Sequence, residues 1–379
     1  MSPAPANPAH VLAHWIDSPD ALRARLASPP ARVGLDTEFI RERTYWPKLA
    51  LVQIALPQAD GGIEILLVDT LAPGIAEALA PLLADASVLK IMHSPSEDLV
   101  AFRQTCKQVP SPLFDTQAAA ALAGVGAGMG YQKLVAEITG TALEKGETRS
   151  DWLRRPLSAS QLQYAADDVQ HLFELHDALT AKLDALGRRG WFQSDMARTM
   201  ATAIEDPADR WPHLSMRTAN FLDRDGQTRL LRLLRWRDAH ARVADLPRSW
   251  VLDNELAATL ARMSPSTPES IAEAVRAHPK GPRKLVDAIW TALGTPLPDE
   301  AEAPDAAVAE RRDKSKVKAL QDAVSRRAAE LGVADAVLAS RRMLEPLVDT
   351  GEWPESLEGW RREQLEPVLA PLLGRAPVG

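Results

Sequence analysis

The sequence predicts an α/β domain with a mixed sheet, followed by two small all-α domains. Three observations lead to this fold class. The first half alternates short β-like runs with helical patterns, as α/β proteins do. From about Gln117 onward the hydrophobic spacing is mostly helical. An acidic, Pro/Ala-rich stretch, Pro296–Asp305, then separates two helical segments and is typical of an exposed linker.

Four runs in the first half predict strands. The first three follow one another closely, and Gly61-Gly62 between the second and the third is typical of a hairpin turn. We therefore expect an antiparallel meander. A helical stretch precedes the fourth run, so we expect that run to join the sheet in parallel. The four predicted strands are Arg32–Phe39, Leu49–Leu56, Ile63–Asp69 and Val88–His93.

The later part of the chain carries clear helix signals. A Gly-rich loop, Gly124–Gly130, interrupts the helical pattern early. Ser158 and Gln161 fit a capping box, in which each side chain hydrogen-bonds the backbone of the other residue. The helix that they begin is predicted to run through Tyr164 to Leu172. The predicted domains are 1–205, 211–294 and 309–379, with a linker over 295–308.

Length and composition narrow the class of protein. The chain of 379 residues is too long for one ordinary domain. No apolar run approaches the roughly 20 residues of a membrane helix, and Met1–His10 lacks the pattern of a signal peptide. The single cysteine, Cys106, excludes an internal disulfide framework and a thiolate zinc cluster. We therefore expect a cytoplasmic protein that does not bind membranes.

The net charge of −7 argues mildly against a nucleic-acid-binding protein. Residues 211–290 nevertheless contain 13 Lys and Arg against 9 Asp and Glu. This weak local basic excess is compatible with nucleic-acid binding, and a solvated helical surface often has a similar excess.

Asp36 and Glu38 lie within an apolar predicted strand. Side chains alternate along a strand, so both carboxylates point to the same side. Two neighbouring carboxylates repel each other and are costly to bury unless a cation neutralises them. Oxygen ligands at this spacing suit Mg²⁺ or Mn²⁺. The alternative is an exposed edge strand with solvated charges, which the apolar neighbours of the pair disfavour.

Two further acidic motifs follow along the chain. Tyr164 and Asp168 are one helical turn apart and share a face, whereas Asp167 points about 100° away. Glu97 and Asp98 come shortly after the fourth predicted strand, where α/β sheets place ligand sites. Either could supply a carboxylate, although acids at a helix start also stabilise the helix dipole.

The order of these motifs resembles the DEDD exonuclease superfamily in its tyrosine branch, and specifically the ribonuclease D family. The resemblance covers nearly the whole chain and implies an RNase H-like exonuclease fold. Besides the acidic motifs, it is carried by Tyr45-Trp46-Pro47, Leu51–Ala55, Phe114–Gln117 and Arg149–Ser158.

The resemblance implies a role for each motif residue. The residue that orients or deprotonates the attacking water matches Tyr164, since the histidine branch would place His where this chain has Gln163. Two divalent metal ions, Mg²⁺ or Mn²⁺, are expected. Asp36 would bridge both ions. The four metal-binding acids match Asp36, Glu38, Asp98 and Asp168.

The C-terminal half resembles the helical HRDC domain shared by ribonuclease D and RecQ-type helicases. The matching run is Leu230–Asp238, and 309–375 resembles a second, more divergent copy. An amphipathic helix that packs into a core explains the same run. Contact with nucleic acid is implied by the family for Arg229, Arg232, Arg235 and Arg237.

Other residues have two open interpretations. His93 could contact a phosphate or be a structural histidine. Tyr45, Trp46 and Trp152 could stack on nucleobases or pack in a core. Basic residues that could hold the substrate backbone, or be ordinary surface charges, are Lys145, Arg149 and Arg155.

The leading functional hypothesis is a 3′–5′ exoribonuclease that trims tRNA precursors and other small structured RNAs and releases nucleoside 5′-monophosphates. We expect it to act as a monomer. A DNA 3′–5′ exonuclease is an alternative, because no motif reports recognition of the 2′-hydroxyl. A catalytically silent RNA-binding scaffold is a third hypothesis, which the intact set of acids disfavours.

Overall fold

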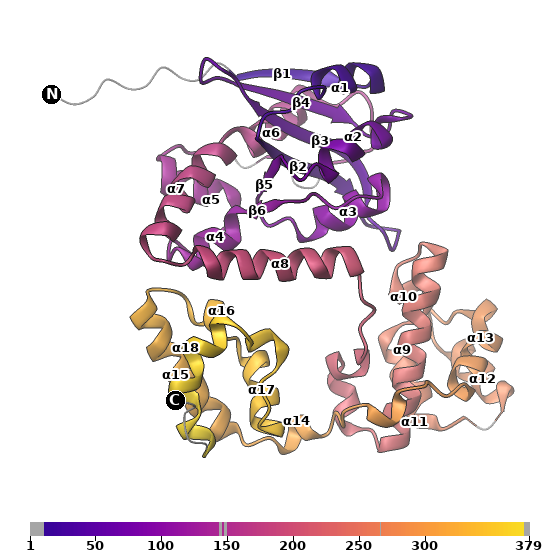
Figure 1. Cartoon of the computed structure of the whole chain (residues 1–379). Helices are drawn as coiled ribbons and strands as arrows, with labels where there is room; N and C mark the ends of the chain where they lie inside the picture. Colours follow the sequence, from indigo (N-terminus) through magenta and orange to yellow (C-terminus); the bar gives the residue numbers. More distant parts are fainter. Residues whose placement is uncertain (1–10, 144–145, 148–149, 266, 375–379) are drawn as a thin grey trace. The chain divides into compact units, whose positions relative to one another are not determined.

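The structure is a computed structural model that describes residues 11–143, 146–147, 150–265 and 267–374. Within these residues, no helix is both long and apolar enough to cross a membrane. The chain divides into two compact units, which we describe separately (Figure 1).

The first unit contains the sheet and is called the sheet unit. It comprises Met1–Ile40, Pro47–Glu205 and Ser315–Gly379. The second, called the helical unit, comprises Arg41–Trp46 and Asp206–Lys314. The domain boundaries predicted from the sequence stay predictions. The packing groups the last helical segment with the sheet and the short segment 41–46 with the helical unit.

The sheet unit has a six-stranded mixed sheet in the order β1-β4-β3-β2-β5-β6. As predicted, β2, β3 and β4 form an antiparallel meander, and β5 pairs with β2 in parallel. The chain passes from β3 to β4 through a short turn in which Gly61 has a φ of 84°. The strands are β1 Val11–Ile16, β2 Arg32–Ile40, β3 Lys48–Pro57, β4 Ile63–Asp69, β5 Leu89–Met92 and β6 Leu113–Asp115.

Both edge strands were missed from the sequence. β1 pairs in parallel with β4, and β6 pairs in parallel with β5. β1 follows the Pro/Ala-rich N-terminus directly, and β6 has only three residues. β6 is too short for its own hydrophobic pattern to predict it, and each edge strand is defined by the neighbour with which it pairs.

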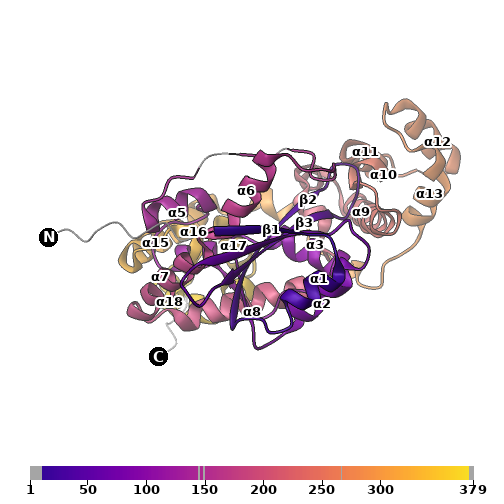
Figure 2. The ribbon, with the colours of Figure 1, turned by 90° about the horizontal axis from the view of Figure 1, so that it is seen from above.

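Two hydrophobic cores cover opposite faces of the sheet. Alternate side chains of β3 divide between them: Val52 and Ile54 join one core, and Leu51 and Ala55 join the other. The first core includes residues of α1, α2 and α3, and the second includes residues of α4 to α7. Figure 2 shows α1 and α2 on one side of the strands and α6 on the other. These helices are α1 Pro19–Arg25, α2 Ile75–Ala84, α3 Ser96–Cys106, α4 Thr116–Leu122, α5 Tyr131–Thr139, α6 Ala159–Gln170 and α7 Leu172–Ala185.

The C-terminal helices complete the second core. The indole rings of Trp191 and Trp360 stack with their centroids 4.4 Å apart. The Asp195 carboxylate accepts two hydrogen bonds from the Arg361 guanidinium, at 2.7 and 2.8 Å. This segment is therefore joined to the sheet unit by aromatic stacking and a paired charge. Trp191 and Asp195 belong to α8 Arg189–Glu205, and the C-terminal helices are α15 Lys314–Leu331, α16 Asp335–Leu338, α17 Arg341–Thr350 and α18 Trp360–Leu369.

The helical unit is built around α9, which has buried leucines on one face, as its amphipathic pattern predicts. Asp223 caps this helix by accepting a hydrogen bond from the Gly226 N–H at 2.7 Å. The core includes side chains from α9, α11, α12 and α13. The helices are α9 Arg224–Ala244, α10 Arg248–Val251, α11 Asn254–Met263, α12 Pro268–Ala277, α13 Val286–Gly294 and α14 Val308–Arg311.

The stretch Pro296–Asp305 is partly exposed, as its composition predicts, but two of its acidic residues pair with side chains of α9. The Asp299 carboxylate accepts a hydrogen bond from Arg235 at 2.7 Å, Glu300 pairs with Arg232, and Ala303 is buried. Its acidic residues suggested solvated charge because their arginine partners lie more than 60 residues earlier in the chain.

Candidate active site

Strand β2 places two carboxylates on the face of the sheet that α6 covers. Val33 and Leu35 pack in the core on the α3 side, so the alternate residues Asp36 and Glu38 point the other way. On their side, a Cβ added at Gly34 would lie 3.1 Å from Leu172 of α7. The predicted shared orientation of Asp36 and Glu38 is confirmed.

The third carboxylate comes from the first turn of α3. β5 pairs with β2 only as far as Gly34, and α3 follows β5 in the chain. β2 itself continues beside β3 to Ile40, so its two acids lie beyond the last residue that pairs with β5. Asp98 is 9% exposed and lies close enough to Asp36 for their charges to interact. The Thr37 hydroxyl donates a hydrogen bond to the Asp98 carboxylate. The neighbouring Glu97 is exposed, so the geometry favours Asp98 as the site residue.

Helix α6 supplies the fourth carboxylate and a phenol. Its predicted capping box is confirmed: the Ser158 hydroxyl accepts from the Gln161 N–H at 3.1 Å, and the Gln161 side chain accepts from the Ser158 N–H at 3.0 Å. The helix packs against β2, β3 and β4. Tyr164 and Asp168 share a face of it, and the two side chains are hydrogen-bonded to each other.

The two acids of β2 bind protons unusually tightly. Burial, and then the charges of Asp98, Asp168 and Glu38, raise the pKa of Asp36 well above its usual value. Burial, and then the charges of Asp168 and Asp98, raise the pKa of Glu38 to about 9. These carboxylates therefore cannot all be ionised at neutral pH without a compensating cation.

The two helix acids behave in the same way. Burial raises the pKa of Asp98 to about 6 and that of Asp168 to about 7. Hydrogen bonds from Thr37 and Tyr164 partly oppose these shifts. Burial, followed by the charge of Asp168, raises the pKa of Tyr164, so this phenol stays protonated at neutral pH.

The four acids fit a divalent cation. They are hard oxygen donors from three separate elements, which is the ligand type that Mg²⁺ and Mn²⁺ prefer. Their raised pKa values have a physical cause that a bound cation would remove, because a nearby positive charge favours the ionised carboxylate. The residues of this cluster that could hold metal are Asp36, Glu38, Asp98 and Asp168.

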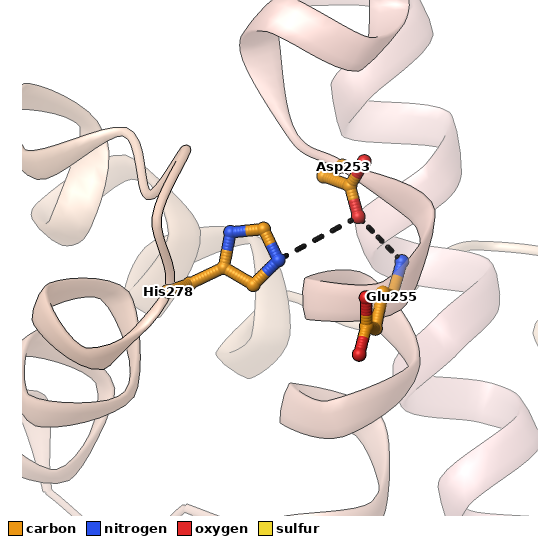
Figure 3. Close-up of side chains that lie close together, drawn as sticks. All are labelled: Asp253, Glu255 and His278. Atoms are coloured by element: carbon orange, nitrogen blue, oxygen red, sulfur yellow. Dashed lines mark hydrogen bonds and ion pairs between the residues drawn. The ribbon is translucent and has the colours of Figure 1, made fainter.

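A different group of possible metal ligands lies in the helical unit, where Asp253, Glu255 and His278 approach one another (Figure 3). Local structure explains this group. Asp253 caps α11 by accepting a hydrogen bond from the Glu255 N–H at 2.8 Å. His278 Nε2 is 3.8 Å from the same Asp253 oxygen. A cap and an ion pair account for these contacts without a metal.

Two of the possible substrate-binding residues have partners within the sheet unit. Trp152 is 1% exposed and belongs to the second core, which favours core packing over stacking on a base. Arg155 donates to both oxygens of Asp69, at 2.6 and 3.0 Å, and to the Ala50 carbonyl at 2.7 Å. A guanidinium held in this way has a structural role, and the prediction that Arg155 holds substrate stays a prediction. Lys145 and Arg149 lie outside the described residues.

His93 is a structural histidine. Its Nδ1 is 2.8 Å from the Thr116 hydroxyl, and its ring meets that of Tyr131 edge-on at 5.7 Å. Burial lowers the pKa of His93 to about 4, so the ring is neutral at physiological pH. These contacts favour the interpretation of His93 as a structural histidine, and its contact with a phosphate stays a prediction.

Tyr45 and Trp46 pack in the helical unit and are not free to stack on bases. Tyr45 is 4% exposed and forms a small cluster with Ala241 and Val251. Its hydroxyl donates to Asp238 at 2.9 Å and accepts from Arg248 at 2.6 Å. These partners lie about 200 residues away in the sequence, so no local pattern could have revealed them.

The four arginines that the family resemblance linked to nucleic acid have partners inside the helical unit. Arg229 donates to the Ala261 carbonyl, and Arg237 donates to the Leu252 carbonyl. Arg232 and Arg235 pair with the acids at 299 and 300 described above. Each guanidinium therefore stabilises the fold around α9.

Three residues beside the acids were not singled out from the sequence. Thr37 orients Asp98, as described above. Gly146 lies directly on the Tyr164 ring, since an added Cβ would be 2.4 Å from Cδ2 of the ring. The Tyr131 hydroxyl contacts the backbone at the end of α6. Only Thr37, enclosed by the two acids of β2, could have been suspected from its position.

Comparisons with known proteins agree with this geometry. Residues 13–184 match a family model described as 3′-5′ exonuclease. The chain is 57% identical over 361 residues to ribonuclease D of Xanthomonas oryzae pv. oryzae, covering 95% of this chain and 98% of the relative. It is 37% identical over 349 residues to ribonuclease D of Pseudomonas paraeruginosa, covering 89% of this chain and 90% of that one.

Among solved structures, the chain is similar to Escherichia coli RNase D, described as an exoribonuclease involved in structured RNA processing. The TM-score is 0.77 at 28% identity, and the match covers 96% of this chain and 99% of that one. The likeness therefore includes the helical regions as well as the sheet.

Proposed function

Since this chain belongs to the ribonuclease D family and is a 3′–5′ exoribonuclease, we propose that it trims tRNA precursors and other small structured RNAs by two-metal-ion hydrolysis. The products would be nucleoside 5′-monophosphates. The observation that carries the proposal is a cluster of four acids from β2, α3 and α6, whose raised pKa values a bound cation would lower. The reaction would take place in the cytoplasm, with the chain acting as a monomer.

The four acids would hold two divalent cations, Mg²⁺ or Mn²⁺. Bound cations would neutralise charge on the scissile phosphate and lower the pKa of the attacking water. Asp36 lies near the other three acids, because the charges of Asp98, Asp168 and Glu38 all raise its pKa. This position suits a carboxylate shared between two ions.

Tyr164 would orient the attacking water. Its phenol stays protonated because burial and the charge of Asp168 raise its pKa. A protonated phenol can donate to Asp168 and accept a hydrogen bond from water, but it cannot remove a proton. Gly146 lies against the Tyr164 ring, and Asp168 is hydrogen-bonded to the Tyr164 hydroxyl. These two contacts would fix the direction in which the hydroxyl meets the water.

The RNA substrate is proposed from the relatives. E. coli RNase D is described as processing structured RNA, and the likeness covers nearly the whole chain. The helical regions would act as HRDC-type modules that bind the body of the RNA while its 3′ end enters the acidic site.

A time course on a 5′-labelled tRNA precursor with a short 3′ extension would test the proposal. Reactions would contain Mg²⁺, Mn²⁺ or EDTA, beside a matched DNA oligonucleotide. We expect stepwise shortening of RNA from its 3′ end that EDTA stops. Shortening of DNA instead would favour a DNA exonuclease, and binding of RNA without shortening would favour a scaffold.

A matched pair of variants would test the site itself. Asp98→Asn and Glu97→Gln each remove one charge from adjacent residues of α3, but only Asp98 faces the other acids. We expect Asp98→Asn to lose most of its activity and Glu97→Gln to retain it. The opposite result would contradict the assignment of the third carboxylate.

A further inference from the structure

A tyrosine hydroxyl interrupts the helical hydrogen bonding directly beside the proposed metal ligand Asp168. In a continuous α-helix the N–H of residue 171 would donate to the carbonyl of residue 167. Here the Tyr131 hydroxyl lies between them: it donates to the Asp167 carbonyl at 3.1 Å and accepts from the His171 N–H at 3.1 Å. The helix breaks at this point, and α6 ends at Gln170.

A side chain inserted into the hydrogen-bond ladder is a recognised cause of a helix kink. The His171 N–H also faces the Val169 carbonyl, only two residues back. Its hydrogen bonding is therefore not that of a regular helix. The Tyr131 hydroxyl satisfies both backbone groups at the break and so fixes where α6 ends and α7 begins.

Neighbouring residues hold Tyr131 in place. It is the first residue of α5, after the Gly-rich loop. The Gln117 side chain donates to the Met129 carbonyl of that loop at 3.1 Å. The His93 ring supports the Tyr131 ring edge-on, and the Thr116 hydroxyl fixes His93. The hydroxyl therefore reaches the break from a fixed support.

We propose that Tyr131 is a positioning residue for the active site and holds the backbone of Asp167 so that Asp168 and Tyr164 face the acids of β2. Asp168 follows the bridged carbonyl directly, and Tyr164 lies one helical turn earlier. Without the hydroxyl, the Asp167 carbonyl and the His171 N–H either lose their partner or close on each other. Both outcomes move Asp168. This inference rests on the proposed function of the four acids.

The chain has three tyrosines, which provides a matched set of variants, each lacking one hydroxyl. Tyr131→Phe removes the bridging hydroxyl and keeps the ring. Tyr45→Phe removes a hydroxyl that also has two partners, but in the helical unit. Tyr164→Phe removes the proposed water-orienting group. The measurements are kcat and KM on the RNA substrate, Mn²⁺ binding by electron paramagnetic resonance, and the unfolding midpoint.

We expect Tyr131→Phe to lower kcat and weaken Mn²⁺ binding by about 10- to 100-fold, as loss of a group that orients metal ligands does, with KM changed less than about twofold. Tyr45→Phe should leave kcat and Mn²⁺ binding unchanged. Tyr164→Phe should lower kcat but retain Mn²⁺ binding. A purely structural role for Tyr131 would lower the unfolding midpoint and leave kcat and Mn²⁺ binding, measured well below it, unchanged.

Asp168→Asn separates failure of this inference from failure of the proposed function. If Asp168→Asn stays active, the site assignment falls. If it is inactive while Tyr131→Phe has the kcat and Mn²⁺ affinity of Tyr45→Phe, only the positioning role of Tyr131 is overturned. If Tyr131→Phe does not fold, Thr116→Val is the second variant. It removes the hydroxyl that fixes His93 against the Tyr131 ring. Unchanged kcat and unchanged Mn²⁺ binding in Thr116→Val would overturn the proposal.

Discussion

Two groups of acidic side chains, one in each unit, behave in opposite ways. In the sheet unit, four carboxylates from β2, α3 and α6 gather together, and burial and mutual repulsion raise their pKa values. In the helical unit, Asp299 and Glu300 pair with arginines, whose hydrogen bonds lower the pKa of each. Burial alone would raise the pKa of Asp238, but hydrogen bonds from Arg248 and Arg242 outweigh it.

This contrast separates charge that stabilises a fold from charge that serves a reaction. A carboxylate held by an arginine is satisfied within the protein. A group of buried carboxylates without such a partner costs stability, and a chain keeps it only where a ligand supplies the missing charge. The Asp299 network therefore stabilises structure, whereas we propose that the acids around Asp36 form a site.

The largest expected effect is that of Asp36→Asn, which removes the carboxylate proposed to be shared between both ions. We expect kcat to fall by about 10²- to 10³-fold or more, because the proposed metal ions lose their shared ligand. RNA binding should persist, since the helical modules are unchanged. In EDTA the variant should unfold at a higher temperature than the wild type, because one repelling charge is gone.

Asp238→Asn is the matched control in the helical unit. It also neutralises one carboxylate, but one that pairs with two arginines. It should lower the unfolding midpoint and leave kcat unchanged. If both variants shift stability in the same direction, the proposed difference between the two units is wrong.

Arg155→Met tests whether an arginine beside the sheet is structural. Asp69 and Arg155 form a largely buried pair, and removing one partner of such a pair costs roughly 3 kcal/mol of unfolding free energy. We expect this loss in a denaturant titration, with an unchanged KM for RNA. Arg154→Met, at an exposed neighbouring position, should change stability little. A raised KM with normal stability would support the predicted role of Arg155 in substrate binding.

The metal-free protein should lose stability as the pH rises. The unfolded carboxyl groups titrate near pH 4, whereas in the folded chain the pKa is about 6 for Asp98, 7 for Asp168 and 9 for Glu38. The folded state thus binds these protons more tightly, so it is favoured at the acid end of this range and is progressively destabilised up to about pH 9. Unfolding midpoints in EDTA between pH 5 and pH 9 would measure the slope.

Added Mg²⁺ should reverse this loss. At about 100 times its dissociation constant, a ligand that binds only the folded state contributes about 2.7 kcal/mol, or roughly 5 °C or more in the unfolding midpoint. The shift should be larger at pH 8 than at pH 6, because more carboxylates must be neutralised. A Mg²⁺ effect that is the same at both pH values would argue against the acids as its site.

Gly146→Ala should have a smaller effect on activity. Its added Cβ would lie 2.4 Å from the Tyr164 ring, so the phenol must move. We expect kcat to fall about tenfold, within the range for a misplaced catalytic group, with little change in KM. Gly190→Ala adds a methyl group where no atom lies within 4 Å and is the control. Equal kcat in both variants would show that Gly146 does not constrain Tyr164.

The sequence predicted those parts of the fold that residues close together in the chain determine. The meander, the parallel β5 and the capping box at Ser158 follow from hydrophobic alternation, turn residues and helix-start chemistry. The shared orientation of Asp36 and Glu38 follows from strand geometry alone. The roles of these acids stay a proposal, but their convergence with Asp98 and Asp168 is a finding of the structure.

What the sequence could not show depends on distant partners. Tyr45 packs against residues about 200 positions away, and Arg155 pairs with Asp69 across 86 positions. Their isolated motifs suggested contacts with RNA because aromatic and basic residues serve both purposes. Tyr131 illustrates the same limit, because only the folded chain brings its hydroxyl to the break after α6.

The smallest expected effect concerns Asp253, where a cap and an ion pair imitate a metal site. Asn caps a helix about as well as Asp, and a partly exposed ion pair contributes roughly 0–1 kcal/mol. Asp253→Asn should therefore change the free energy of unfolding by less than about 1 kcal/mol, and by the same amount with or without EDTA. Asp253→Ala should cost about 1 kcal/mol, because the cap itself is lost.

If EDTA destabilises the wild type but not Asp253→Asn, then a metal binds at α11. In that case the acids of the sheet unit would not be the only ones that depend on a cation, and the contrast between the units would have to be redrawn.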